Sequence, residues 1–140
     1  MLGKVLVATD GSEPAKHALR YVLEYAPEGA EVIVLSVTPP VKDREDFGRL
    51  LNQGESWKLL FNRILAESEA IAKEARPDVN LRALLKEGKP KDVIVDTADE
   101  EDVDMIVMGS RGIGGVEGWL LGSTSRAVVN ECRNPILIIK

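Results

Sequence analysis

Short apolar runs recur along the chain, and longer segments with a different spacing of apolar positions separate them. The runs are rich in Val, Ile, Leu and Met, as expected for strands buried on both faces of a parallel sheet. The third run is weaker, because Arg82 interrupts it, and it is more typical of an edge strand. We therefore predict five strands, over residues 5–8, 32–37, 81–85, 105–108 and 136–139.

Apolar residues at helical spacing fill the segments between these runs. In residues 15–22 the apolar positions are three or four apart, so they share one face of a helix. Ser12 is a favourable N-cap for that helix, and Pro14 fits its first turn. Further helices are predicted over residues 57–75, 90–98 and 125–132.

Strands and helices thus alternate along the whole chain. This order predicts an α/β fold, with a mostly parallel sheet, right-handed crossovers and helices on both faces. A length of 140 residues suits one domain, so residues 1–140 are expected to form a single unit. The one long loop, from Pro39 to Gln53, is either a lid or interaction surface or a solvated excursion.

Composition narrows the classes of function. A net charge of −5 argues against binding nucleic acid or anionic membranes through bulk positive charge. With one cysteine, Cys132, and one histidine, His17, an internal disulfide, a thiolate zinc site and a histidine metal cluster are excluded. We expect Cys132 in the core or an interface and His17 on the surface. Without a membrane span or signal peptide in the pattern, a cytoplasmic protein is expected.

Ligands of open α/β sheets bind beyond the carboxyl ends of the strands, so the residues there are the candidates for a site. The stretch from Gly109 to Ser125 follows the fourth run and is rich in glycine. Glycine N–H groups and the start of the next helix can bind a phosphate, although such a turn can also be purely structural. The lysine of a P-loop and the third glycine of a dinucleotide fingerprint are both missing here.

The glycine spacing matches a different motif. Gly109-x2-Gly112-x9-Gly122-Ser123 resembles the G-2x-G-9x-G-S/T motif of ATP-binding universal stress proteins, and Met108 precedes it as in that family. The resemblance extends over the whole chain. It includes the first strand with its acidic turn, the G-x-P after the third strand, the D-x-I-V-M-G of the fourth and the N-P before the fifth, at residues 5–12, 88–90, 104–109 and 134–139.

The resemblance implies a Rossmann-like sheet in the order 3-2-1-4-5, with a nucleotide at the ends of strands one and four. Asp10 would accept hydrogen bonds from ribose, and the main chain of Val37 would contact the adenine edge. Any Mg²⁺ or Mn²⁺ would be held through the phosphates. The other implied contacts are Ala8, Thr9 and Met108 around the nucleoside, Gly109 and Gly112 against ribose and phosphates, and Gly122, Ser123, Thr124 and Ser125 around the phosphates; Arg111 occupies a variable position of the motif.

Binding and turnover are separate questions. ATP hydrolysis needs an activated water, and the sequence offers no base beyond Asp10, which the resemblance assigns to ribose. The first hypothesis is therefore a sensor or regulator in stress response that binds ATP, ADP or AMP. The alternatives are a slow ATPase or self-phosphorylating enzyme, and an interaction module without nucleotide. The apolar last strand, Ile136–Ile139, would be a sheet edge in the implied order, so we also expect a homodimer through it.

Overall fold

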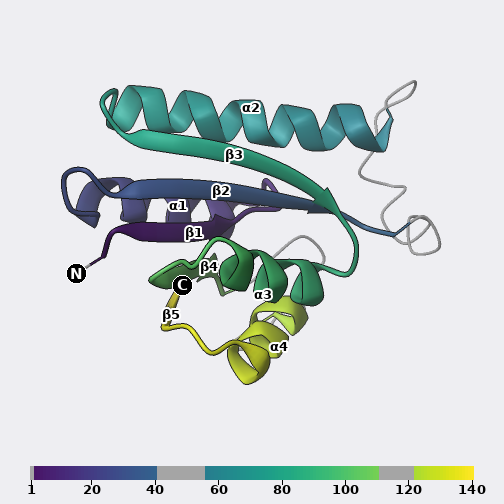
Figure 1. Ribbon diagram of the computed structural model, residues 1–140. Helices are drawn as coiled ribbons and strands as arrows, with labels where there is room; N and C mark the ends of the chain where they lie inside the picture. The colour runs from purple at the N-terminus through teal and green to yellow at the C-terminus, as the bar shows by residue number, and fades with distance from the viewer. Residues whose placement is uncertain (1, 41–55, 111–121) are drawn as a thin grey trace.

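A computed structural model describes residues 2–40, 56–110 and 122–140. Strands and helices alternate along these residues (Figure 1), as the sequence predicts. The elements are β1 (Lys4–Ala8), α1 (Glu13–Tyr25), β2 (Glu31–Thr38), α2 (Trp57–Ala75), β3 (Asn80–Glu87), α3 (Pro90–Glu100), β4 (Met105–Gly109), α4 (Ser123–Glu131) and β5 (Ile136–Ile139).

The five strands form one parallel sheet in the order β3-β2-β1-β4-β5. This confirms the predicted α/β class and strand order, with β3 and β5 at the two edges. The direction in which successive strands are added reverses between β1 and β4, because β2 and β3 lie on one side of β1 and β4 and β5 lie on the other. In open α/β sheets that position forms a crevice at the carboxyl ends of the strands.

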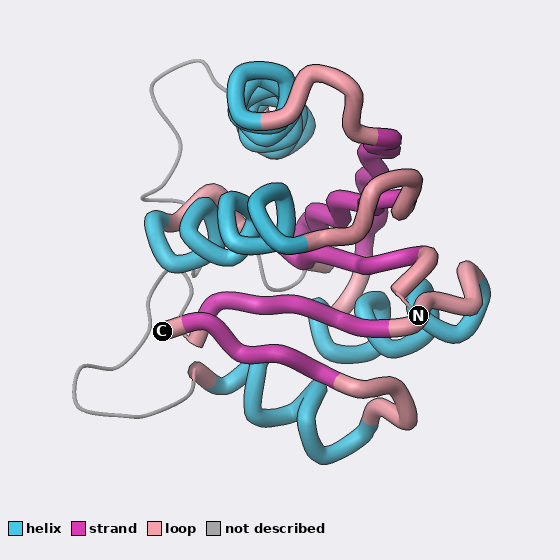
Figure 2. The backbone as a smooth tube through the Cα atoms, turned by 90° about the vertical axis from the view of Figure 1, so that its left-hand side faces the viewer, coloured by secondary structure: helices cyan, strands magenta, loops and turns pink. Residues whose placement is uncertain are grey.

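Helices cover both faces of the sheet (Figures 1 and 2). On one face, Val5, Val34 and Val107 pack against α1 and α2; on the other, Leu6 and Ile106 pack against α3 and α4. Alternation of side chains along each strand explains why one apolar run serves two cores. In the central strands, the apolar runs that predict the strands are therefore buried on both faces of the sheet.

The helix boundaries follow local signals in the sequence. Ser12 is the N-cap of α1, with its hydroxyl accepting the Ala15 N–H at 3.3 Å, as predicted. The last helix begins at Ser123 and is followed by Cys132, which is half-buried and donates its thiol to the Asn134 carbonyl at 3.4 Å. His17 is exposed on α1, as expected. Residues 41–53 of the predicted loop lie outside the described residues.

Candidate functional site

The turn after β1 is built around two short side chains. Thr9 Oγ1 accepts the Gly11 N–H at 3.2 Å, and Asp10 Oδ1 accepts the Ser12 N–H at 3.0 Å. Gly11 has φ +81°, which a residue with a side chain rarely adopts. A Cβ on it would also lie 2.8 Å from Ile64 Cγ1 of α2. The turn is thus fixed by its own hydrogen bonds, and it holds the Asp10 carboxylate at the end of β1.

The end of β4 lies directly against the start of α1. A Cβ on Gly109 would lie 2.8 Å from both the carbonyl carbon and the oxygen of Pro14, so only glycine allows this approach. Gly109 and the turn that holds Asp10 therefore lie at the same end of the sheet, after β4 and β1 respectively. This brings together the two halves of the site that the sequence predicts.

Ser110 ties the end of β4 to the start of α4. Its carbonyl accepts the Gly122 N–H at 2.5 Å and the Ser125 hydroxyl at 3.3 Å, while its own N–H donates to Ile139 of β5 at 2.8 Å. Residues 110 and 122 are consequently adjacent in space although eleven residues separate them in the chain. The first turn of α4 is thereby anchored at the carboxyl end of β4.

The start of α4 has the chemistry of an anion site. Gly122 is its N-cap, and among the described residues no side chain caps this helix. Ser123 is exposed and Thr124 half-buried, whereas Ser125 is buried and its hydroxyl also lies 3.1 Å from the Gly122 carbonyl. The first N–H groups of a helix have no partner within it, and the helix dipole makes this end attractive to negative charge.

Val37 lies at the same end of the sheet, in β2. The next carbonyl, that of Thr38, accepts the Gly88 N–H on the β3 side of the strand at 3.0 Å. Neighbouring residues in a strand direct their main-chain groups to opposite sides, so the N–H and carbonyl of Val37 point toward β1. The paired register with β1 ends two residues earlier, at Ala8 and Leu35. Val37 therefore presents one donor and one acceptor beside the turn after β1.

The structure gathers most of the predicted site residues at the carboxyl ends of β1, β2 and β4. Ala8 and Met108 are buried in the core on the α3 and α4 face. Arg111 and Gly112 lie outside the described residues. Those gathered are Ala8, Thr9, Asp10, Val37, Met108, Gly109, Gly122, Ser123, Thr124 and Ser125.

Two serines of this region were not predicted from the sequence. Ser36 is fully buried in β2 and donates its hydroxyl to the Thr9 carbonyl at 3.0 Å, and Ser110 forms the junction described above. For Ser36 a signal existed: it is a polar residue in the otherwise apolar run from Val32 to Val37. A buried hydroxyl is costly unless it is hydrogen-bonded, which points to a specific partner.

The described residues also bear on metal binding and on membrane insertion. Within residues 2–40, 56–110 and 122–140, no group of three or more His, Cys, Asp or Glu side chains is placed to hold a metal ion. In the same part of the chain, no helix has both the length and the apolar character needed to span a bilayer.

Comparison with known proteins gives a consistent result. The family model described as the universal stress protein family matches residues 1–140. A universal stress protein of Thermus aquaticus is 34% identical over 148 residues, covering 100% of both chains. The solved structure of MJ0577 from Methanocaldococcus jannaschii has a TM-score of 0.80 and 32% identity, covering 100% of this chain and 96% of that one.

A third relative was solved with a ligand. The universal stress protein of Archaeoglobus fulgidus in complex with dAMP has a TM-score of 0.72 and 26% identity, covering 100% of this chain and 98% of its own. The strand order, the spaced glycines and these matches agree with one another. The chain belongs to the universal stress protein family.

Proposed function

We propose that residues 1–140 form a single cytoplasmic domain that binds an adenine nucleotide, ATP, ADP or AMP, between β1 and β4. The observation that carries this proposal is the start of α4. It lies at the carboxyl end of β4 with no side-chain cap among the described residues. An anionic group placed there would be held by main-chain N–H groups, which the chain's net charge of −5 does not weaken.

The phosphates are assigned to this helix start. Ser123 is exposed and Thr124 half-buried, so both hydroxyls are within reach of a ligand, while the buried Ser125 holds the base of the segment. Gly122, Arg111 and Gly112 are assigned with them through the glycine motif. A Mg²⁺ or Mn²⁺ ion would be held through phosphate oxygens, as is common for nucleotide-bound magnesium.

The nucleoside is assigned to the β1 and β2 side. Asp10 stands at the end of β1, where its carboxylate would accept hydrogen bonds from the ribose hydroxyls. Ala8, Thr9 and Met108 would line the nucleoside, and Gly109 would lie against the ribose. The N–H and carbonyl of Val37 would contact the adenine edge. The dAMP complex of the Archaeoglobus fulgidus relative supports an adenine nucleotide as the ligand class.

We propose a nucleotide-dependent sensor or regulator of stress response rather than an efficient enzyme. At the ends of β1 and β4, Asp10 is the described acidic side chain, and its Oδ1 already accepts the Ser12 N–H. Hydrolysis would need a base free to activate water. Release of phosphate from ATP at a rate typical of enzymes, about 1 per second or faster, would contradict this assignment.

We also propose a homodimer through β5. Ile136, Leu137 and Ile138 are half-buried on the edge strand, where one side of the main chain has no neighbouring strand among the described residues. An apolar edge strand is a template for pairing with a second copy. Analytical ultracentrifugation at micromolar concentration should give twice the monomer mass of 15.3 kDa, and a monomer alone would refute the dimer.

The test of nucleotide binding is direct. The purified protein is denatured, the released small molecules are identified by mass spectrometry, and the stripped protein is titrated with ATP, ADP and AMP, with and without Mg²⁺. We expect an adenine nucleotide in the extract and saturable binding in the calorimeter. If no nucleotide is released and none binds below millimolar concentration, the proposed function is wrong.

A further inference from the structure

The pairing between β1 and β2 stops earlier than the pairing on the other side of β2. With β1 the register ends at Ala8 and Leu35, whereas with β3 it continues to Thr38 and Glu87. One more step of a parallel ladder would require the Val37 N–H to donate to the Thr9 carbonyl. It would also require the Val37 carbonyl to accept the Gly11 N–H.

Two hydroxyls take the place of these missing ladder bonds. The Thr9 carbonyl accepts the Ser36 hydroxyl at 3.0 Å, and the Gly11 N–H donates to Thr9 Oγ1 at 3.2 Å. The side chains involved are well packed, since Ser36 is 0% and Thr9 is 7% exposed. The two groups that a longer ladder would pair with Val37 are the Thr9 carbonyl and the Gly11 N–H, directly after β1. Both are therefore already hydrogen-bonded to side chains.

We propose that Ser36 and Thr9 are positioning residues that end the β1–β2 ladder. They thereby keep the N–H and the carbonyl of Val37 available to the base of the nucleotide. This inference rests on the proposed function and names the residues that give it base specificity. Adenine carries an amino donor beside a ring-nitrogen acceptor, which complements the carbonyl and N–H of one residue in a strand. Guanine carries a carbonyl oxygen where adenine has its amino group, so that oxygen would face the Val37 carbonyl.

The chemistry explains why a hydroxyl is needed at position 36. A buried carbonyl without a partner costs free energy, so the Thr9 carbonyl requires a donor. Ser36 supplies one from its side chain. If residue 36 is Ala, the nearest donor in register is the Val37 N–H. The β1–β2 ladder then extends by one step, and the Val37 N–H is no longer available to the ligand.

The test compares Ser36→Ala with Ser68→Ala. Ser68 is a matched control, because it is also a buried serine with a hydroxyl bonded to a carbonyl, that of Ile64 at 3.0 Å within α2. The dissociation constants of AMP and GMP are measured for each protein. We expect Ser36→Ala to weaken AMP binding about tenfold, the worth of one hydrogen bond. GMP binding should change little, so the preference for adenine shrinks by the same factor.

Ser68→Ala should leave that preference unchanged even if it lowers the melting temperature. An unchanged ratio of the AMP and GMP constants in Ser36→Ala would overturn the inference. Failure of the unaltered protein to bind AMP would instead refute the proposed function, which the wild-type titration reports separately.

Amide hydrogen exchange gives a readout that needs no ligand. In the free wild-type protein the Val37 amide should exchange quickly, because no ladder partner protects it, and AMP should slow it. In Ser36→Ala without ligand, the same amide should become protected as it bonds the Thr9 carbonyl. A Val37 amide that is already protected in free wild-type protein, or unaffected by Ser36→Ala, would contradict the arrangement.

Discussion

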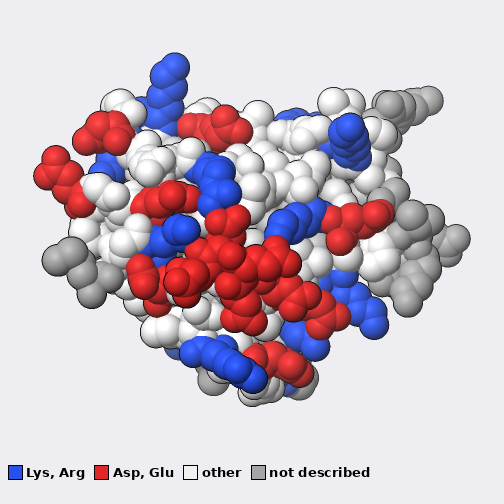
Figure 3. All heavy atoms as spheres, in the orientation of Figure 1, with Lys and Arg blue, Asp and Glu red and all other residues white. Residues whose placement is uncertain are grey.

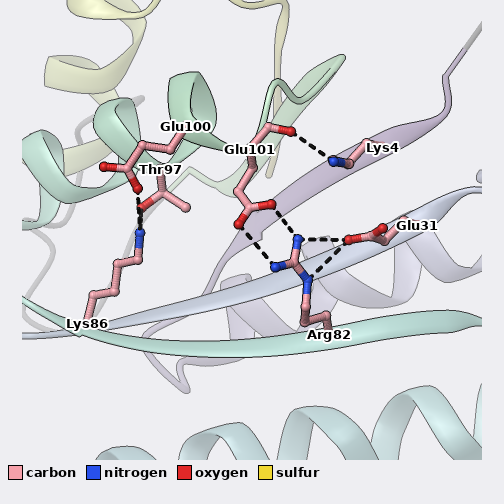
Figure 4. Close-up of polar contacts among 7 residues, drawn as sticks. All are labelled: Lys4, Glu31, Arg82, Lys86, Thr97, Glu100 and Glu101. Atoms are coloured by element: carbon pink, nitrogen blue, oxygen red, sulfur yellow. Dashed lines mark hydrogen bonds and ion pairs between the residues drawn. The ribbon is translucent and has the colours of Figure 1, made fainter.

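The polar groups at the amino ends of the strands are arranged differently from those at the carboxyl ends. At the amino ends, charges are paired within the chain: the Arg82 guanidinium of β3 donates to the carboxylates of Glu31 and Glu101 (Figure 4). At the carboxyl ends of β1 and β4 lie the Asp10 carboxylate, the hydroxyls of Ser123 and Thr124, and the start of α4, which at Gly122 has no side-chain cap among the described residues. The charges at the amino end are therefore paired within the chain, whereas the carboxyl end is where we propose that the nucleotide binds.

The amino end needs its pairing because it is acidic. Figure 3 shows acidic side chains gathered over α3 and the loop that follows it, a region that holds Asp99, Glu100, Glu101, Asp102 and Asp104. These residues lie at or beyond the C-terminal end of α3, where the helix dipole disfavours negative charge. Basic side chains offset them: Lys4 donates to the Glu101 carbonyl at 2.9 Å, and Lys86, which reaches α3 from the carboxyl end of β3, donates to Glu100 at 3.1 Å (Figure 4).

If this contrast is right, a change at the carboxyl end affects ligand affinity and a change at the amino end affects stability. The largest effect is expected for Gly122→Val, which places a side chain where the phosphates would meet the first turn of α4. We expect affinity for ATP to fall about 100-fold or more, because two or more hydrogen bonds to a charged group are lost. Isothermal titration calorimetry measures the loss.

The matched control is Gly3→Val at the opposite end of the sheet. Gly3 is exposed, and among the described residues a Cβ there would meet only Asp104 Oδ2, at 3.4 Å. This variant should bind ATP like the wild type, and Gly122→Val should keep a cooperative thermal transition. Equal affinities for ATP in the two variants would show that the start of α4 does not contact the nucleotide.

The second prediction concerns the place where β4 meets α1. In Gly109→Ala the new Cβ would lie 2.8 Å from Pro14 main-chain atoms, which cannot move as a flexible side chain can. We expect the free energy of unfolding to fall by about 1–3 kcal/mol. Affinity for ATP should fall as well, because β4 would be pushed away from the start of α1, which directly follows the turn that holds Asp10. Urea unfolding and calorimetry on the same preparation measure both.

Gly3→Ala serves as the control for this step. Its Cβ would make an ordinary contact, so both stability and affinity should stay close to the wild-type values. A Gly109→Ala protein as stable as Gly3→Ala would show that β4 and α1 are less closely packed than the structure has them.

Most of the fold could be predicted because its signals are local. The apolar runs at residues 5–8 and 105–108 are long enough to define buried strands, and Ser12 and Pro14 mark the start of α1 by their own chemistry. The strand order could not follow from periodicity, since register depends on contacts between distant segments. It came from the resemblance to a family, and the structure confirms it.

Site residues could be predicted only where a continuous stretch of the sequence carries a recognisable motif. The glycine-rich stretch from Gly109 to Ser125 makes an anion site one of two interpretations, and the spacing of its glycines favours that site through the family resemblance. The role of Ser36 depends on Thr9, which is 27 residues away, and on the register that brings the two together. No spacing rule encodes such a contact, so the pairing of hydroxyls that ends the β1–β2 ladder required the structure.

The third prediction tests the amino end through pH. Asp104 Oδ2 accepts the N–H groups of Gly3 and Lys4, at 2.8 and 2.9 Å, and these hydrogen bonds hold the pKa of its carboxyl below the ordinary value of 3.8. A lowered pKa means that the charged form stabilises the fold above about pH 4. That contribution is lost as the pH falls below the ordinary value and through the folded one.

In Asp104→Asn the shape of the side chain is kept and the charge is removed. We expect its melting temperature to lie a few degrees below that of the wild type at pH 7, with the two values converging as the pH falls below about 4. ATP affinity should not change. A pH-independent difference would mean that the charge of Asp104 does not hold the start of β1.

The smallest effect is expected for Arg82→Gln, because Arg82 is exposed and surface ion pairs contribute little. Its loss leaves Glu31 and Glu101 facing each other on an acidic surface, and the pKa of Glu101, which Arg82 holds low, should rise. The melting temperature should fall slightly at low ionic strength, and the difference should vanish near 1 M NaCl, where screening acts within about 3 Å. Arg20→Gln, at an exposed position of α1, makes the same change in net charge. A salt-sensitive loss of the same size in that variant would attribute the effect to net charge and not to the pairing at the amino end.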